Sequence, residues 1–328
     1  LGLFNNRLRI TTDYYKKKTT DLLYSVAVPA TSGYQTMLKN IGSIENQGYE
    51  LSIESDNLTG AFSWTTAFNI AFNRNKVLEL GGEEYKEMAE GDGHLKTGSV
   101  RRLIVGEPIG VFYGYRFDGI FQNEEECKQQ TSSASPIGVG LRRYKDLNGD
   151  GKVDAANDRE ILGDANPKFF GGLTNTFAYK GFELNVFLQY SYGNKILNYN
   201  AMELENPTGG QNAYADMVNR WTPENPSNIY PKATTNRALL VSDRFIEDGS
   251  YLKLKTLSLS YSFPKINLKH IQGLRLYVTG QNLLTWTKYR GYDPEVSYRG
   301  ASTLEAGEDF GGYPQSRTFM FGIKLDIK

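Results

Sequence analysis

The sequence has 328 residues, enough for one large domain or two ordinary ones. Its 37 Lys and Arg residues balance 37 Asp and Glu residues, so charge gives no reason to expect nucleic acid as a partner. The single cysteine, Cys127, excludes an intrachain disulfide and a zinc site built from cysteines. Only two histidines, His94 and His270, are present, which leaves little for histidine-dependent catalysis.

Alternation of apolar and polar residues is the main pattern in the first part of the chain, and it predicts β-strands. The stretches FNNRLRITTDYYKKK and ENQGYELSIESDN show it weakly. The stretch FSWTTAFNIAFN shows it strongly, because Ser and Asn residues occupy one face while the other face carries Phe62, Trp64, Phe68, Ile70 and Phe72.

The second half of the chain continues this alternation. KFFGGLTNTFAYK, FELNVFLQYSYG, YLKLKTLSLSYSF, LRLYVTGQNLLT and RTFMFGIKLDIK are further strands, which brings the number of long strands to eight. In FELNVFLQYSYG the apolar residues share one face, with Phe187 as the exception. In YLKLKTLSLSYSF the apolar parity changes sides, and this predicts a β-bulge near Lys255.

The predicted connections alternate between long and short. Long loops are expected at about 19–44, 77–167, 194–250 and 286–316, and short turns at 58–60, 180–181 and 264–273. Transmembrane barrels show this asymmetry, with long extracellular loops and short periplasmic turns. The sequence therefore predicts an all-β chain that forms part of a transmembrane antiparallel β-barrel, with its apolar face toward lipid. The stretch GVFYGYRFDGIF also reads as strand, but including it in the barrel would break the alternation, so it is assigned to a loop.

A second feature is the acidic stretch YKDLNGDGKVDAANDRE, which resembles a calcium loop of the EF-hand type. A glutamate is missing at the last ligand position, where Asn157 stands, and the flanking sequence breaks helices. Two readings stay open: a calcium site, or a turn rich in Asp and Asn without metal. The candidate calcium ligands are Asp146, Asn148, Asp150, Lys152 (through its carbonyl), Asp154 and Asp158.

No spacing of carboxylates singles out a catalytic pair of the glycosidase kind, and no glycine-rich phosphate fingerprint is present. The sequence is therefore expected not to be an enzyme and to need no organic cofactor. Aromatic residues in the predicted loops could stack on sugar rings or pack within the protein; they are Trp221, Tyr230, Trp286, Tyr289, Tyr292 and Tyr298.

Several motifs in this order carry a resemblance over nearly the whole chain. NIGSIENQGYELSIES, GEPIGVFYGYRFDGIFQ, YKDLNGDGKVDAANDREILGDANPKFFGG, LKTLSLSYSFP, LRLYVTGQNLLTWTKYRGYDPE and YPQSRTFMFGIKL are similar to the C-terminal part of SusC-like (SusC/RagA) TonB-dependent outer-membrane transporters. The resemblance implies that the chain forms about the last eight strands of a plugged barrel of about 22 strands. The plug and the earlier strands would then lie outside residues 1–328.

The resemblance also implies a function and partners. It implies import of oligosaccharides or peptides across the outer membrane of a Bacteroidota-type bacterium. A SusD-like surface lipoprotein would cover the barrel, and the TonB complex would engage a region outside this chain. The alternative is a secreted β-sandwich adhesin or glycan-binding protein, held together by calcium, in which the apolar faces form a core.

Overall fold

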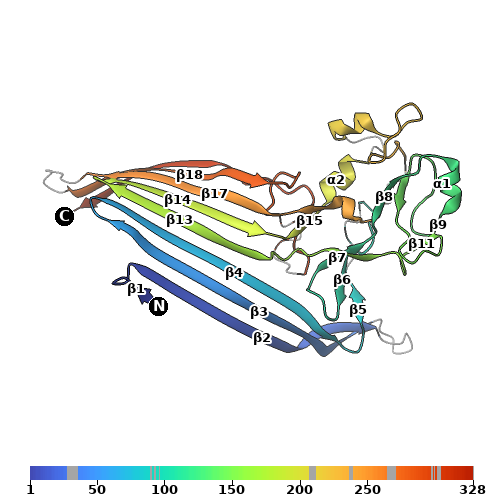
Figure 1. Cartoon of the computed structure of the whole chain (residues 1–328), viewed down its shortest axis with the longest axis horizontal. Coiled ribbons are helices and arrows are strands. Elements are labelled where there is room, and N and C mark those ends of the chain that lie inside the picture. Colours follow the sequence, from blue (N-terminus) through green and yellow to red (C-terminus); the bar gives the residue numbers. More distant parts are fainter. Residues whose placement is uncertain are drawn as a thin grey trace.

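The computed structural model describes residues 1–27, 36–88, 91, 94–95, 97–206, 212–235, 239–263, 271–296, 298, 300 and 304–327. One antiparallel sheet of nine strands dominates it (Figure 1). In spatial order the strands are β1 (Gly2–Leu3), β2 (Leu8–Ala27), β3 (Thr36–Thr59), β4 (Phe62–Leu80), β13 (Phe169–Tyr179), β14 (Phe182–Tyr192), β17 (Tyr251–Ser262), β18 (Ile271–Thr287) and β20 (Thr318–Ile327).

Eight of these strands are long, as predicted. They follow one another in the sheet in the same order as in the sequence, and insertions separate some consecutive strands. The tight turn predicted at Lys180–Gly181 is confirmed. Lys180 and Gly181 both have positive φ, of 46° and 89°, as a two-residue hairpin turn of the favoured hand requires. The turn between β3 and β4 occupies residues 60–61, and residues 264–270 lie outside the described part of the chain.

The bulge predicted near Lys255 is also confirmed. Thr256 pairs with Phe187 and Leu254 pairs with Leu188, so Lys255 is the additional residue on its strand. The register with β18 shifts at the same point. The bulge explains how both halves of β17 keep their apolar residues on one side of the sheet.

The structure differs from the predicted loop at 19–44, because residues 19–27 and 36–44 belong to β2 and β3. The strands continue past register shifts near Leu22, next to Asp21, whose φ is +58°. These irregularities interrupt the alternation, which is why the sequence pattern ends before the strands do. Two smaller differences are that β4 continues to Leu80 and β18 to Thr287.

The three insertions after β4, β14 and β18 gather at one end of the sheet and form a single body, which we name the cap (residues 81–168, 193–250 and 288–317; Figure 1). The first insertion contains β5 (Tyr85–Glu87), β6 (Arg101–Ile104), β7 (Val111–Gly114), β8 (Phe117–Ile120), α1 (Glu124–Gln129), β9 (Thr131–Ser132), β10 (Arg142–Tyr144), β11 (Lys152–Val153) and β12 (Glu160–Gly163). The other two contain β15 (Lys195–Asn198), α2 (Tyr199–Leu204), η2 (Ala215–Asn219), η3 (Asp243–Phe245), β16 (Ile246–Asp248) and β19 (Glu308–Asp309).

The cap holds the main hydrophobic core of the described residues. Phe112 and Leu95 from the first insertion meet Leu197 and Phe245 from the second, and Phe310 from the third packs against them. The stretch GVFYGYRFDGIF supplies β7 and β8 to small sheets of the cap, which confirms its assignment outside the main sheet. No helix in the described residues is long and apolar enough to cross a membrane.

Candidate functional site

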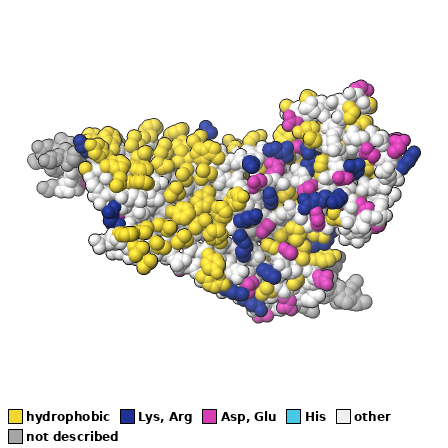
Figure 2. All heavy atoms as spheres, viewed as in Figure 1, with side chains coloured by type: hydrophobic (Ala, Val, Ile, Leu, Met, Phe, Trp, Pro, Cys, Tyr) yellow, Lys and Arg dark blue, Asp and Glu magenta, His cyan; other side chains and the backbone are white. Residues whose placement is uncertain are grey.

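The main sheet has two faces of opposite character. The face that the sequence predicts to meet lipid, here called the apolar face, is open to the surroundings: Phe182 is 52% exposed and Phe321 is 81% exposed. Hydrophobic side chains gather over the sheet, whereas charged side chains gather toward the cap (Figure 2). The cross-strand register places these predicted residues on one side of the sheet: Phe62, Trp64, Phe68, Ile70, Phe72, Phe182, Leu184, Val186, Leu188, Tyr190, Tyr192, Phe319, Phe321, Ile323, Leu325 and Ile327.

The opposite face is polar, and its side chains bond across neighbouring strands. The Asn185 amide donates to the Thr176 hydroxyl (2.9 Å), and the Ser258 and Thr279 hydroxyls lie 2.7 Å apart. Arg275 forms an ion pair of 2.6 Å with Glu183. The sheet therefore has an uncovered apolar surface on one side and, on the other, a polar surface of the kind that a barrel turns toward its lumen.

Phe187 and Asn175 are among the residues that depart from this alternation, and each has a local partner. Phe187 lies on the polar face, as the sequence predicts, and its ring covers Gly172, where a Cβ atom would come within 2.8 Å of it. Asn175 lies on the apolar face, where its side-chain oxygen accepts hydrogen bonds from the Trp64 indole (2.9 Å) and the Thr66 hydroxyl (2.7 Å). Phe187 thus fills the space left by a glycine, and the Asn175 oxygen on the apolar face is paired within the sheet.

The predicted calcium loop forms a series of tight turns between β10 and β12. Asp146 accepts hydrogen bonds from the Gly149 and Gly151 amides, each at 2.7 Å. Asp150 accepts from the Lys152 amide, and Asn148 accepts from the Asp150 amide. The Asp and Asn side chains thus satisfy backbone donors of their own turns.

Asp158 closes the same loop. It is fully buried, and its two carboxylate oxygens accept from the Leu147 and Asp154 amides, each at 2.7 Å. Asp154 in turn accepts from the Ala156 and Asn157 amides, and these bonds, with the Lys152 ammonium, hold the pKa of the Asp154 carboxyl below its usual range. Across the described part of the chain, no three His, Cys, Asp or Glu side chains converge as a metal ion requires. In this conformation the loop matches the turn reading, and calcium binding stays a prediction.

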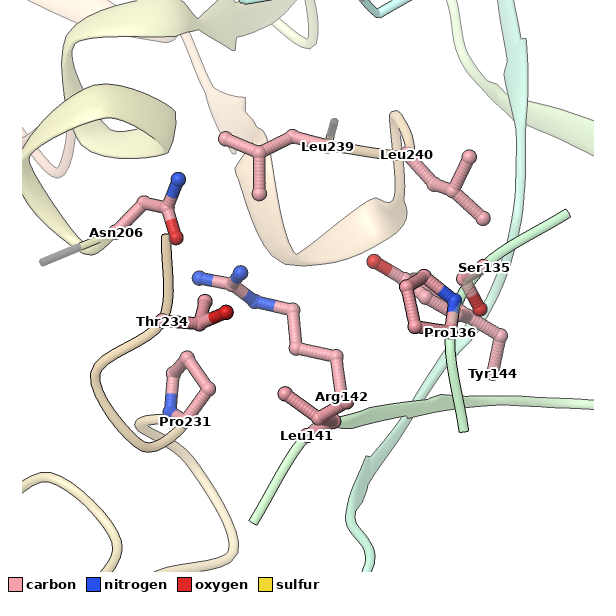
Figure 3. Close-up of a pocket in the computed structure, with 10 residues that line it drawn as sticks. All are labelled: Ser135, Pro136, Leu141, Arg142, Tyr144, Asn206, Pro231, Thr234, Leu239 and Leu240. Atoms are coloured by element: carbon pink, nitrogen blue, oxygen red, sulfur yellow. The ribbon is translucent and has the colours of Figure 1, made fainter. Parts of the chain in front are cut away.

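The cap also contains a small cavity of about 110 Å³ with a buried arginine in its wall (Figure 3). Arg142 extends its guanidinium toward Asn206 and Thr234. One of its nitrogens donates to the Glu205 carbonyl (3.0 Å), but its Nε–H and the Asn206 side-chain oxygen have no hydrogen-bond partner. Burial lowers the pKa of Arg142. The cavity has room for ordered water, which could serve both groups.

Other buried charges join the three insertions of the cap. Arg101 forms an ion pair of 2.8 Å with Glu308, and both side chains are 2% exposed. Arg101 also donates to the Gly110 and Ala306 carbonyls. Glu205, fully buried, receives Arg244 at 2.7 Å and Arg290 at 2.9 Å. The second and third insertions are therefore linked to each other, and the third to the first, by charge as well as by the shared core.

A polar cluster connects the third insertion to the sheet. The Lys253 ammonium lies 2.5 Å from Asp293 and 2.6 Å from Glu295, and Lys255 also reaches Glu295 at 2.6 Å. Burial opposes ionisation of Glu295, but the hydrogen bonds and charges of the two lysines hold its pKa below the ordinary value. Because Lys255 is the bulged residue, the bulge directs a second cation toward the insertion.

The aromatic residues proposed to stack on sugars are dispersed. Trp286 lies in β18 rather than in a loop, opposite Leu252 of the apolar face. Tyr289 is buried and its hydroxyl bonds to Asp309. Tyr292 is the most open of the set, at 77% exposure. The structure does not bring these side chains together as one sugar platform; the remaining members are Trp221, Tyr230 and Tyr298.

Comparisons with known proteins agree with this architecture. The chain is 40% identical, over 99% of its length, to TonB-dependent receptor P3 of Formosa agariphila, and 29% identical to TonB-dependent receptor SusC of Bacteroides thetaiotaomicron. It covers 33% and 31% of those two proteins. Among solved structures it matches the RagAB peptide transporter with a TM-score of 0.78 and 26% identity, over 99% of this chain and 34% of the other. No family model matches the sequence.

These likenesses bear on both the sequence and the fold. They extend over nearly every residue of the chain, and the sheet described above has the fold of the RagA barrel wall. The chain spans about a third of the length of the curated relatives that it matches. The resemblance to SusC-like TonB-dependent receptors is therefore confirmed: over nearly its whole length the chain is similar to about a third of such a receptor.

Proposed function

We propose that the protein containing this chain is the barrel component of a TonB-dependent importer in the outer membrane of a Bacteroidota-type bacterium. The observation that carries the proposal is the pairing of an exposed apolar face with a polar face on one long antiparallel sheet, with every long insertion at one end. The similarity to receptors of the SusC kind supports the same assignment.

The edges of the sheet support a barrel section. The strand order ends at β1 and β2 on one side and at β20 on the other, and no further strand of the described residues pairs with either edge. An exposed edge as long as β20 is an aggregation hazard unless another strand covers it. Strands outside residues 1–328 would complete the barrel and leave no edge open.

The substrate class we propose is an oligosaccharide or a peptide. The solved structure with a TM-score of 0.78 is a peptide transporter, which supports a peptide as the cargo. A second relative is a TonB-dependent receptor named SusC, and its name gives no substrate. The polar face of the sheet and the inner surface of the cap would contact the cargo. Transport of this kind needs no catalytic side chain, and the named relatives are receptors and transporters.

The partners we propose are a SusD-like surface lipoprotein, which would lie over the cap, and the TonB complex, which would engage a region outside this chain. The similarity to the RagAB transporter, whose name joins two components, supports a partner protein of the SusD kind. The cap offers a built surface for such a partner, because its insertions share one core and several buried ion pairs.

The test is uptake by intact cells. A strain that lacks the gene for the full-length protein should fail to accumulate one of two fluorescently labelled cargoes, a peptide mixture or an oligosaccharide mixture. Dissipating the inner-membrane proton gradient should abolish the same uptake in the parent strain. Two results together would overturn the proposal and favour the calcium-held adhesin instead. They are unchanged uptake of both cargoes in the deletion strain and recovery of the protein in the soluble fraction of the parent strain.

A further inference from the structure

The apolar face ends toward the cap in two rows of charged side chains. In the register of β2, β3 and β4, Tyr14 pairs with Tyr49 and Tyr49 with Phe72. This aromatic row is exposed, at 55%, 62% and 39%. The next two rows toward the cap on the same face are Lys16–Gln47–Arg74 and Lys18–Glu45–Lys76.

All four cations of these rows are exposed, and a single carboxylate accompanies them. Glu45 forms an ion pair of 3.1 Å with Lys16. Arg74 donates to the Lys168 carbonyl through one terminal nitrogen (2.9 Å). We name this patch the cationic rows (Lys16, Lys18, Arg74 and Lys76, with Glu45 between them). Four cations and one anion give these two rows a net charge of three.

The geometry of the cationic rows fits a phosphate-bearing group. Strands lie about 4.8 Å apart and residues two apart along a strand are separated by about 6.7 Å, so the four side chains start within roughly 12 Å of one another. Lys and Arg side chains lay their methylenes on apolar surface and carry their charge to its polar border. A phosphate in front of the patch could therefore receive several donors at once.

The alternate residues of β2, β3 and β4 lie on the polar face of the sheet. Lys17 pairs with Asn46 and Asn46 with Asn75, on the polar face. There the Asn75 oxygen accepts from the Ile109 amide of the cap (2.6 Å). The cationic rows thus lie on the other side of the sheet from this contact between Asn75 and the cap. They continue the apolar face toward the cap.

We propose that the cationic rows bind the phosphate group of a lipid headgroup in the outer leaflet, whose acyl chains would lie on the apolar face beside Tyr14, Tyr49 and Phe72. The inference rests on the proposed function, because only a membrane-embedded sheet brings a lipid to this border. Charge complementarity and the direct continuity with an exposed apolar surface distinguish a lipid from a free anion.

The experiment uses the full-length receptor in nanodiscs of phosphatidylcholine containing a small fraction of lipid A, and counts retained lipid A by native mass spectrometry. The test variant is Lys16→Gln/Lys18→Gln/Lys76→Gln, which leaves Arg74 and its backbone bond intact. Lys17→Gln is the matched control, because it removes a neighbouring cation from the other face. Each cation near a membrane surface changes binding by about fivefold, so removing three should weaken retention of lipid A by between about tenfold and about a hundredfold.

Three outcomes would overturn the inference: retention equal to the parent, an equal loss in Lys17→Gln, or displacement of lipid A by inorganic phosphate alone, which would indicate a site for free anions. If the triple variant fails to fold, the parent receptor decides the matter through salt, because binding by exposed cations must weaken as ionic strength rises. Uptake by cells is a separate readout. A receptor that retains lipid A in the membrane but imports neither cargo would defeat the proposed function and leave the lipid site standing.

Discussion

The sheet and the cap are stabilised in different ways. The sheet consists of long strands whose apolar side chains stay exposed. Within the sheet, backbone hydrogen bonds between strands are therefore the main stabilising interaction, and the apolar side chains need a surrounding apolar medium. The cap consists of strands of two to four residues and short helices, yet it contains the largest buried cluster and the buried ion pairs. Regular strands thus accompany the least buried region, and irregular segments form the region most like a soluble domain.

The largest expected effect is local to the cap. Replacing Arg101 by Met leaves the buried Glu308 carboxylate without its ion pair, and removal of one partner of such a pair costs about 3–5 kcal/mol. Hydrogen exchange should rise throughout the cap, while strand amides of the sheet stay protected. Arg142→Met is the matched control, since Arg142 is buried without a side-chain ion pair and should cost about 1 kcal/mol or less. Equal losses in the two variants would contradict this account.

The second prediction compares the two faces of the sheet at adjacent positions. Val186 lies on the apolar face and Asn185 on the polar face of β14. Val186→Arg should destabilise the full-length barrel by about 2–4 kcal/mol in a bilayer, because the charge meets hydrocarbon. Asn185→Arg should cost under about 1 kcal/mol. Urea titration in lipid vesicles measures both, and a reversed order would show that the faces have been assigned the wrong way round.

The third prediction concerns the acidic loop. Asp158→Ala removes the buried carboxylate that accepts hydrogen bonds from the Leu147 and Asp154 amides, and should cost about 2–3 kcal/mol within the cap. Calcium removal by a chelator should loosen residues 146–158 and leave the sheet folded, if the loop binds the ion. Proteolysis of the loop with and without chelator measures this. Loss of the entire thermal transition on chelation would refute a purely local role.

The smallest effect is a pH dependence of the join between cap and sheet. The folded-state pKa of Glu295 is depressed by Lys253 and Lys255, so its ion pairs stabilise the join above the ordinary glutamate value, near pH 4.5. That stabilisation is lost as the pH falls through the lower, folded-state pKa. Amide exchange of residues 288–296, corrected for intrinsic rates, should therefore accelerate in acid. Glu295→Gln should make the rate nearly independent of pH in this window.

Much of the sheet could be predicted from the sequence because alternation is a local pattern. The apolar faces of β4, β14 and β20, the turn at Lys180 and the bulge at Lys255 all follow from residues within one or two strands. The outer parts of β2 and β3 could not, because irregular pairing near Asp21 interrupts the period. The length of a strand beyond such a point depends on its partner rather than on its own pattern.

The cap could be located but not described. The sequence places GVFYGYRFDGIF outside the sheet, but its partners come from insertions far along the chain, such as Val241 and Phe245. A strand of four residues carries too little periodicity to identify such partners. The ion pairs Arg101–Glu308 and Arg244–Glu205 are likewise invisible to spacing arguments, since they join residues 207 and 39 positions apart. The acidic loop could be identified, but its use of carboxylates to hold backbone amides required coordinates.

The shared core of the cap has a consequence for the order of folding. Leu95 and Phe310 contribute to the same cluster although more than two hundred residues separate them, and Arg101 reaches Glu308 over 207 positions. Closing so long a loop is entropically costly until the intervening strands have paired and brought the insertions together. The cap should therefore be the last part to consolidate, after β13, β14, β17, β18 and β20 have joined the sheet. Its formation would then require that the strands of the sheet have already paired in the correct register.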